Sequence, residues 1–204
     1  MANARPRLIV FSDTARVDVA FMLERFTALA ERALDGSVLF TLRDYTLPVR
    51  ARLALAERLA DLTNRARQWF GVAERADLAR AFGCAAFHLP QGGLSAADAR
   101  GYLGAEVFLS RGAHDPASAV EAELDAVLLS PIFEARKGRP ALGVVALERA
   151  RAVHPEQAWF ALGGVEAGNA ATCRALGVDG VAVIGAALAA DPVPLLAALG
   201  ILRP

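Results

Sequence analysis

Short apolar segments alternate with amphipathic segments along the whole chain, and this alternation constrains the fold more than any other feature of the sequence. The apolar segments recur about every 25 residues, which is the length of one strand-plus-helix unit in a compact parallel barrel. Each segment is nearly continuous in apolar residues, as expected for a parallel strand that is covered on both faces. The predicted strands span residues 7–13, 37–44, 68–74, 85–90, 105–110, 126–133, 158–163 and 180–184.

The segments between these strands place apolar residues at helical spacing. In residues 48–66, for example, Leu53, Leu59 and Leu62 fall on one side and arginines and acids on the other. We therefore predict an α/β fold with one domain over residues 1–204, a (β/α)8 TIM barrel. An open doubly wound sheet is the competing arrangement. The predicted helices span residues 17–32, 48–66, 75–82, 95–103, 116–123, 144–153, 168–176 and 192–199.

Charge and hydropathy exclude several classes of partner. The chain has 22 basic and 22 acidic residues, so it lacks the basic excess that nucleic-acid binding normally requires. No apolar run reaches the roughly 18 residues needed to cross a bilayer. Ser12 and Asp13 end the first apolar run too early for a signal peptide. We expect a cytoplasmic protein without a nucleic-acid or membrane partner, either monomeric or a small homo-oligomer.

Glycines follow the seventh and eighth predicted strands. Gly163 and Gly164 come after one strand, and Ile184 and Gly185 end the other. In a (β/α)8 barrel these two loops lie side by side and often bind phosphate. Glycine lets backbone N–H groups approach an anion closely. We therefore predict a phosphate-binding cradle, with glycines that merely turn the chain as the structural alternative.

Polar side chains at or near the ends of the second to sixth predicted strands are further candidates. Arg43 and Lys137 can hold a second anionic group, Arg43 through a planar guanidinium and Lys137 as a compact charge. An ion pair with Asp44 or another acid, or a solvated surface charge, is the alternative for these residues. The candidates are Arg43, Glu74, His88, Gln91, His114 and the segment 130–139, which contains Glu134, Arg136, Lys137 and Arg139.

Two histidines in this set have different surroundings in the sequence. His114 follows the fifth predicted strand and precedes Asp115 and Pro116, on the face where barrels carry out chemistry. Its imidazole can transfer protons near neutral pH, so we consider it a catalytic candidate. His88 lies inside an apolar run, where a hydrogen-bonded structural role is the alternative to substrate binding.

The ordered segments of the chain resemble the superfamily of thiamine phosphate synthases and TenI proteins. Residues 128–133 are similar to the family's Gly-Pro-Ile-Phe segment, residues 160–165 to its Ala-Ile-Gly-Gly-Ile strand end, and residues 175–184 to its Gly-Ala-Asp-Gly-Val-Ala-Val stretch. Upstream, residues 8–13 resemble the opening strand and residues 86–91 a Val-His-Leu-Gly-Gln segment. The resemblance implies a single-domain (β/α)8 barrel that handles thiazole phosphates. It assigns substrate or phosphate binding to Gly163, Gly164, Ile184, Gly185, Gln91, His88 and Glu134.

The synthases of this family join a pyrimidine-methyl diphosphate to thiazole phosphate, and magnesium neutralises the diphosphate that leaves. The resemblance thus implies Mg²⁺ as cofactor, Arg43 and Lys137 on the diphosphate, and Glu74 as a metal ligand. The chain departs from the family here. Residues 41–45 keep the arginine of the Gln-x-Arg-x-Lys pattern but lose its glutamine and lysine, and the second metal aspartate falls on Gly93.

Two alternatives remain open beside the synthase. A TenI-type thiazole tautomerase needs one substrate, no metal and no other cofactor, and the family histidine that moves the proton aligns with His114. A non-catalytic paralogue would bind a phosphorylated thiazole or thiamine compound. In each case the partner is a phosphorylated small molecule.

Overall fold

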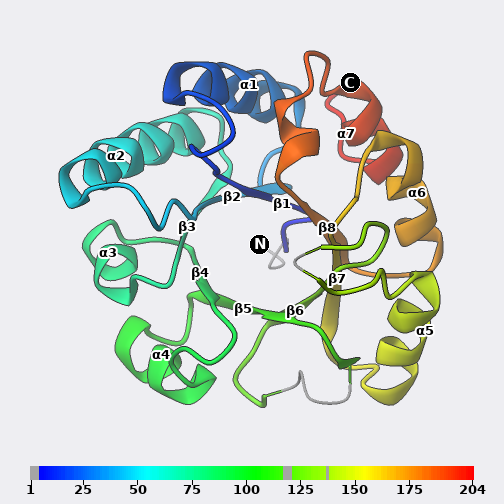
Figure 1. Ribbon diagram of the computed structural model, residues 1–204. Helices are drawn as coiled ribbons and strands as arrows, with labels where there is room; N and C mark the ends of the chain where they lie inside the picture. The colour runs from blue at the N-terminus through cyan, green and yellow to red at the C-terminus, as the bar shows by residue number, and fades with distance from the viewer. Residues whose placement is uncertain (1–4, 117–120, 137) are drawn as a thin grey trace.

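Eight parallel strands follow one another in chain order around a closed barrel in the computed structural model of this chain (Figure 1). The structure describes residues 5–116, 121–136 and 138–204. β8 pairs with β1, with Val183 opposite Val10, and this pairing closes the sheet. The closed sheet confirms the predicted TIM barrel and excludes the open sheet. The strands are β1 (Leu8–Phe11), β2 (Val38–Leu42), β3 (Trp69–Ala73), β4 (Ala86–Leu89), β5 (Phe108–Ala113), β6 (Ala126–Leu129), β7 (Ala158–Leu162) and β8 (Gly180–Val183).

Helices form a ring outside the strands (Figure 1). Asp18 and Ser95 begin two of them as side-chain caps, accepting hydrogen bonds from the backbone N–H groups of Phe21 and Asp98. No helix in the described ranges has both the length and the apolar character that a membrane span requires. The helices are α1 (Val19–Arg32), α2 (Val49–Arg65), α3 (Ala76–Ala81), α4 (Ala96–Leu103), α5 (Val144–Val153), α6 (Ala167–Ala175), α7 (Val193–Leu199) and the 3₁₀ helix η2 (Gly185–Leu188).

Three predicted elements differ from the structure by three residues or more. The sixth strand was expected at 126–133 but β6 ends at Leu129, and Ile132 and Phe133 instead donate backbone hydrogen bonds to Leu162 and Gly163. The fifth strand was expected at 105–110 but lies at 108–113, because the Arg100 guanidinium binds the carbonyls of Ala105 and Val107 and so holds that stretch in the loop. Arg111 and Gly112, beyond the expected end of the strand, pair with Val127 and Leu128 of β6. Of the helix expected at 116–123, residues 117–120 lie outside the described residues, and residues 121–123 form no helix.

Each strand contributes to two apolar layers. In β1, Ile9 and Phe11 point into the barrel, whereas Leu8 and Val10 pack under the surrounding helices. The interior also holds Leu39, Phe108, Leu128 and Phe160, and the outer layer holds Phe26, Phe40, Phe87 and Trp159. Burial on both faces explains why the strands are nearly continuous in apolar residues.

Gly180, the first residue of β8, is closely surrounded by neighbouring atoms. A Cβ atom on Gly180 would lie 2.3 Å from the Arg7 carbonyl oxygen and 2.5 Å from Cε1 of Phe160. The first neighbour is backbone of the adjoining strand and cannot move without disturbing the barrel. Gly180 is therefore required by close packing.

We predict that Gly180→Ala lowers the free energy of unfolding by about 1–3 kcal/mol, because the added methyl group overpacks the interior. Gly168→Ala is the matched control: a Cβ atom there meets nothing within 4 Å, and the residue is in α6. The control should be neutral or slightly stabilising. Urea denaturation measures both, and equal stability of Gly180→Ala and the parent would contradict the packing argument.

A polar layer lies above the apolar interior of the barrel. His88 Nδ1 is 3.0 Å from the Ser110 hydroxyl oxygen, and the His88 ring meets the Phe11 ring edge-on with 5.0 Å between centroids. Burial lowers the pKa of His88 to about 3, and the positive charges of Arg43 and Arg111 add to this effect. The imidazole is therefore neutral near pH 7.

We predict that His88 makes the protein less stable as the pH falls from about 6.5 to about 3. The pKa of His88 is lower in the folded chain than the roughly 6.5 of an unfolded one, so the unfolded state binds the extra proton in this window. The free energy of unfolding should fall by at most about 1.4 kcal/mol per pH unit from this group. Denaturation at several pH values should show a shallower slope for His88→Gln; an unchanged slope would refute the assignment.

Candidate functional site

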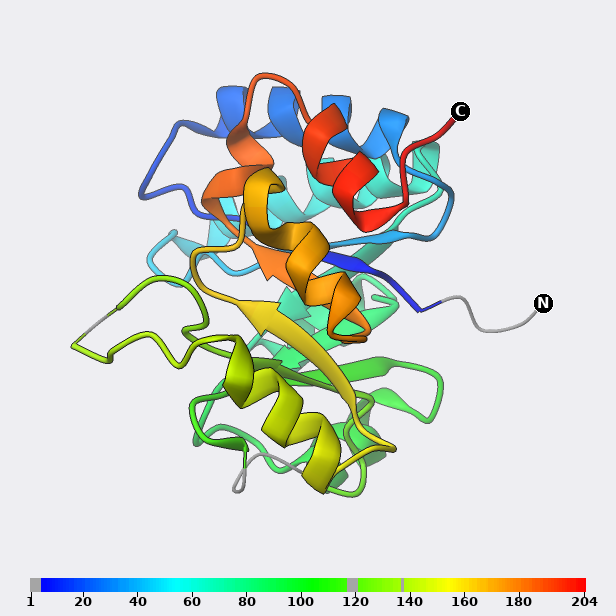
Figure 2. The same ribbon diagram turned by 90° about the vertical axis from the view of Figure 1, so that its right-hand side faces the viewer.

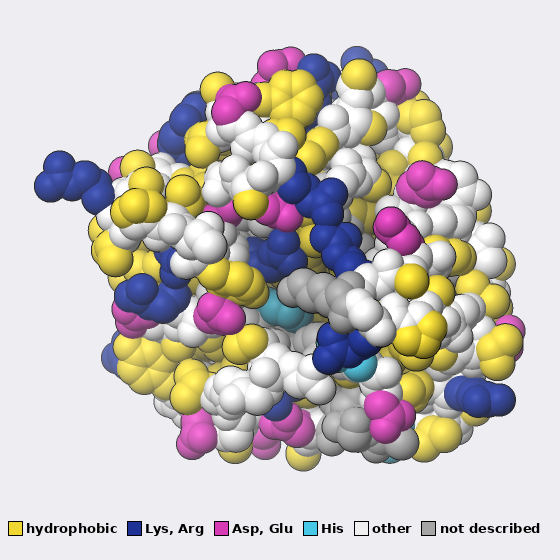
Figure 3. All heavy atoms as spheres, viewed as in Figure 1, with side chains coloured by type: hydrophobic (Ala, Val, Ile, Leu, Met, Phe, Trp, Pro, Cys, Tyr) yellow, Lys and Arg dark blue, Asp and Glu magenta, His cyan; other side chains and the backbone are white. Residues whose placement is uncertain are grey.

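Two adjoining cavities open at the carboxyl end of the barrel strands. Figures 1 and 3 view this end, and Figure 3 shows arginine side chains gathered around a central hollow. Figure 2 shows the start of β1 and the loop that follows β6 at opposite ends of the barrel. Both cavities therefore lie on the face where (β/α)8 barrels carry out chemistry.

The first cavity, here called the glycine chamber, lies between the loops that follow β6, β7 and β8. Its volume is about 630 Å³. Its lining includes the predicted cradle residues, together with cations and carboxylates from neighbouring loops: Arg16, Phe133, Glu134, Arg136, Leu162, Gly163, Gly164, Val165, Glu166, Asn169, Ala182, Val183, Ile184, Gly185 and Ala186.

The second cavity, here called the mouth chamber, has a volume of about 550 Å³. It shares Arg136, Leu162, Gly163 and Ile184 with the glycine chamber, so the two cavities adjoin. The rest of its lining comes from the ends of other strands and their loops: Ser12, Asp13, Ala15, Arg43, Asp44, Tyr45, Thr46, Gln91, His114, Ser130, Pro131 and Arg139.

The two glycines after β7 are required by both conformation and packing. Gly163 and Gly164 have φ values of 94° and 73°, in the left-handed region that side chains disfavour. A Cβ atom on Gly163 would lie 2.9 Å from Cα of Pro131, and one on Gly164 would lie 2.9 Å from the backbone nitrogen of Glu134. The turn after β7 thus fits against the loop after β6, and this fit shapes the wall of the glycine chamber.

Backbone donors from two loops line the glycine chamber. In the part of the chain that the structure describes, the amides of Gly164 and Val165 donate no hydrogen bond. Gly185 is the first residue of η2, so its N–H has no acceptor within that helix. The Asn169 side chain donates to the Gly164 carbonyl oxygen at 2.9 Å and holds the turn in place. Free amides of this kind can bind an anion.

Charged side chains of both signs line the same chamber. Arg16 and Arg136 supply positive charge. The Glu166 side chain is already occupied, because it caps the first turn of α6 in a reciprocal arrangement with Asn169. Glu134 lies in the chamber, but its carboxylate is an acceptor that repels an anion, and what touches the glycine turn is its backbone and Cβ.

One carboxylate positions an arginine in each chamber. Asp13 Oδ2 lies 3.2 Å from a terminal nitrogen of Arg43 and 3.1 Å from Nε of Arg16. The Arg43 guanidinium also lies 5.7 Å from the centroid of the Phe11 ring and 6.0 Å from that of Tyr45. Asp13 thereby restricts the directions in which both arginines can present their remaining N–H groups.

The neighbouring acid has a different role. Asp44 is buried and accepts hydrogen bonds from the Ser12 hydroxyl and the Thr14 amide. The Ser12 hydroxyl oxygen in turn accepts a bond of 2.9 Å from the Arg43 amide. Asp44 therefore joins the loops after β1 and β2, and the ion-pair partner of Arg43 is Asp13 rather than Asp44.

His114 comes directly after β5 and lines the mouth chamber together with Gln91. Its Nδ1 lies 2.6 Å from the carbonyl oxygen of Ser130, which precedes a cis bond to Pro131. Because a carbonyl oxygen only accepts, we assign the ring proton to Nδ1 and the basic lone pair to Nε2. This tautomer suits a residue that removes a proton from a ligand.

Tyr45 adds a neutral donor to the mouth chamber. Burial of the hydroxyl, followed by the negative charge of Glu74, raises the pKa of Tyr45 to about 12. The phenol is therefore protonated at neutral pH and can donate a hydrogen bond.

Three other sequence candidates fall outside the two chambers or outside the described residues. His88 lies within the barrel and lines neither chamber. Glu74 is exposed after β3, with a φ of 65°, and it also lines neither. Lys137 lies outside the described residues.

The residues present do not fit the magnesium site that the family resemblance implies. A Cβ atom on Gly93 would lie 2.7 Å from Cγ of Pro90, so that position has neither a carboxylate nor space for one. Asp13 and Asp44 are held by arginines and by loop hydrogen bonds. The described residues contain no group of three or more His, Cys, Asp or Glu side chains that could hold a metal ion.

Reasoning from the sequence missed three residues of the site, Asp13, Arg16 and Tyr45. Asp13 follows the first apolar run directly, and the positional rule that selected His114 would have found it. Tyr45 gave a weaker signal, since it stands where the family pattern has lysine. Arg16 gave no signal, because only the turn after β1 brings it to Asp13 and to the glycine chamber.

Comparison with known proteins identifies the family of this chain. Residues 12–187 match the model of the TMP-TENI family, described as thiamine monophosphate synthase. The chain is 36% identical to the thiamine-phosphate synthase of Mycolicibacterium smegmatis over 178 residues, which cover 79% of this chain and 78% of that protein. It is 32% identical to that of Thermobifida fusca over 192 residues, which cover 91% and 86%.

A solved structure supports the fold. The thiamine phosphate pyrophosphorylase from Pyrococcus furiosus superposes with a TM-score of 0.79 at 23% identity, and the match covers 95% of each chain. The family match and the two relatives show that this chain belongs to the thiamine monophosphate synthase family.

Proposed function

We propose that the protein is a thiamine phosphate synthase-like transferase, which joins thiazole phosphate to a pyrimidine-methyl diphosphate and releases diphosphate. The observation that carries this proposal is the pair of adjoining chambers, one with free backbone amides and the other with arginines. Gly163, Ile184 and Arg136 form their common wall. Two phosphorylated substrates bound on either side would have their reacting ends close together.

We assign the following roles to the residues of the two chambers. The amides of Gly164, Val165 and Gly185 bind the thiazole phosphate, assisted by Arg16. A carbon–nitrogen bond forms between the pyrimidine methylene and the thiazole nitrogen while the carbon–oxygen bond to diphosphate breaks. Arg43, and in the family pattern Lys137, would hold the diphosphate that leaves with the bonding electrons.

We propose that one domain over residues 1–204 acts on these phosphorylated small molecules. The expectations that the protein is cytoplasmic, binds no nucleic acid and is either a monomer or a small homo-oligomer stay predictions from the sequence.

A substitution at Gly164 cannot test the cradle, because any side chain there would disturb the fold through its φ of 73° and its contact with Glu134. Gly185 is the better position. A Cβ atom there meets only a terminal nitrogen of Arg16, at 3.6 Å. Aspartate and asparagine at this site differ in charge but hardly in shape.

We predict that the purified protein forms thiamine phosphate from the two substrates, and that Gly185→Asp lowers kcat/KM at least about tenfold relative to Gly185→Asn, because it puts a negative charge beside a phosphate. Chromatography of the product measures the rate, with and without Mg²⁺. No product from the parent protein in either condition would overturn the synthase proposal. Equal rates for the two variants would overturn the cradle.

The thiazole tautomerase is a second candidate, favoured by the basic Nε2 assigned to His114. His114→Asn keeps a donor for the Ser130 carbonyl oxygen but removes the base. If the protein isomerises a thiazole phosphate carboxylate alone, we predict a loss of about 100-fold or more in this variant. Proton exchange followed by NMR measures the rate. A parent protein without isomerisation, or a variant that keeps it, would reject this candidate; ligand binding without either activity would indicate a non-catalytic paralogue.

A further inference from the structure

The described residues of the mouth chamber carry unneutralised positive charge. Arg43 is paired with Asp13, and Asp44 is occupied by Ser12 and Thr14. Arg136 and Arg139 take part in none of the ion pairs among the described residues. Two arginines without an ion-pair partner thus line a cavity whose two carboxylates are already engaged.

The backbone fixes these two arginines relative to each other. The amide of each residue donates to the carbonyl oxygen of the other, at 2.9 and 3.0 Å, and Gly138 between them has a φ of 75°. This narrow turn brings both residues to the mouth chamber. Arg136 also lines the glycine chamber, whereas Arg139 lines the mouth chamber alone. Each guanidinium offers a planar set of N–H groups that matches two phosphate oxygens.

Among the described residues, both carboxylates that line the mouth chamber, Asp13 and Asp44, are already engaged by arginines or by loop hydrogen bonds. Glu74 lies outside the chamber, and Gly93 can carry no side chain in its present conformation. The negative charge on a departing diphosphate must nevertheless be balanced. Arginine side chains can supply the positive charge in place of a metal ion. Among the described residues, the cationic groups that line the mouth chamber are the guanidiniums of Arg43, Arg136 and Arg139.

We infer that the mouth chamber binds a diphosphate group directly through Arg43, Arg136 and Arg139, without a divalent metal ion. This inference rests on the proposed function for the identity of the diphosphate-bearing substrate. It differs from that proposal in assigning the neutralisation of the leaving group to arginine side chains of this chain. Binding of inorganic diphosphate can therefore be tested apart from catalysis.

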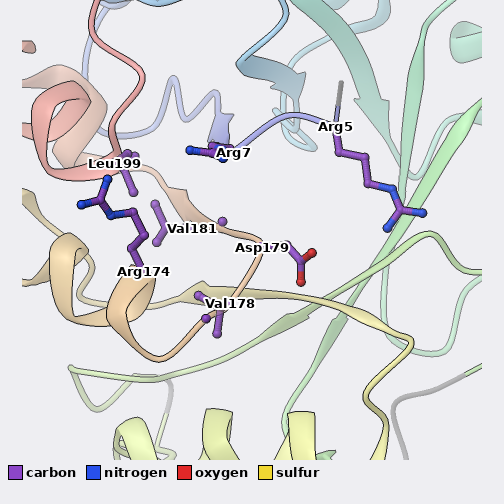
Figure 4. Close-up of a pocket in the computed structure, with 9 residues that line it drawn as sticks. Arg5, Arg7, Arg174, Val178, Asp179, Val181 and Leu199 are labelled. Carbon is purple, nitrogen blue, oxygen red and sulfur yellow. The ribbon is translucent and has the colours of Figure 1, made fainter. Parts of the chain in front are cut away.

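Another arginine-bearing hollow provides the matched control. Arg5, Arg7 and Arg174 line a cavity of about 630 Å³ at the amino end of the strands. Figure 4 shows that Arg5 extends to the opposite side from Arg7 and Arg174, so the three side chains do not converge. The Arg7 side chain is exposed and has no ion-pair partner among the described residues. Arg7→Gln thus removes an equal charge far from the mouth chamber.

The experiment is calorimetric titration of the full chain with inorganic diphosphate in the presence of EDTA. We expect the parent protein to bind, and Arg136→Gln and Arg139→Gln each to raise Kd at least about tenfold, since each loses a charge-assisted contact. Arg7→Gln should bind like the parent. A thermal melt of each variant checks that it is folded.

Three results would overturn the inference: binding only after Mg²⁺ is added, unchanged affinity in Arg139→Gln, or an equal loss in Arg7→Gln. Thiamine phosphate formation that strictly requires Mg²⁺ would also overturn it while supporting the proposed function. Conversely, diphosphate binding in EDTA by a protein that makes no thiamine phosphate would support the metal-free site and reject the synthase.

Discussion

Burial of every strand on both faces is the constraint on which the rest of this structure depends. Side chains of β1 alternate between the barrel interior and the helix layer, and both layers consist of buried apolar residues. Polar side chains can therefore meet a ligand only where the strands end. The carboxyl ends of the strands collect Asp13, Arg43 and His114 around one opening, although these residues are far apart in the chain.

Two local contacts turn that opening into a defined pair of chambers. The glycine turn after β7 fits against residues 131–134, with no space for a Cβ atom, and so fixes the wall between the chambers. Asp13 then holds Arg16 on one side and Arg43 on the other. A rigid wall and directed cations pre-organise the site, so that less conformational freedom is lost when phosphorylated ligands bind.

The departures from the family pattern are concentrated in one part of the site. The glycines that line the first chamber are kept, whereas the positions that would hold a metal ion have become an exposed glutamate at 74 and a crowded glycine at 93. The mouth chamber has arginines instead. A common barrel can thus keep one phosphate site while the neighbouring anion site is built from different groups.

The sequence alone determined the barrel, the order of its strands and the glycine loops, because apolar periodicity and turn residues report local backbone preferences that the tertiary fold preserves. It misplaced β5 by three residues, since Arg100 in α4 binds the carbonyls that the strand would have used. Only the tertiary structure decided that Arg43 pairs with Asp13, that Asp44 joins two loops, and that Arg16 reaches the glycine chamber. Those contacts depend on which loops meet at the barrel mouth, and no local pattern encodes the distance between residues on different loops.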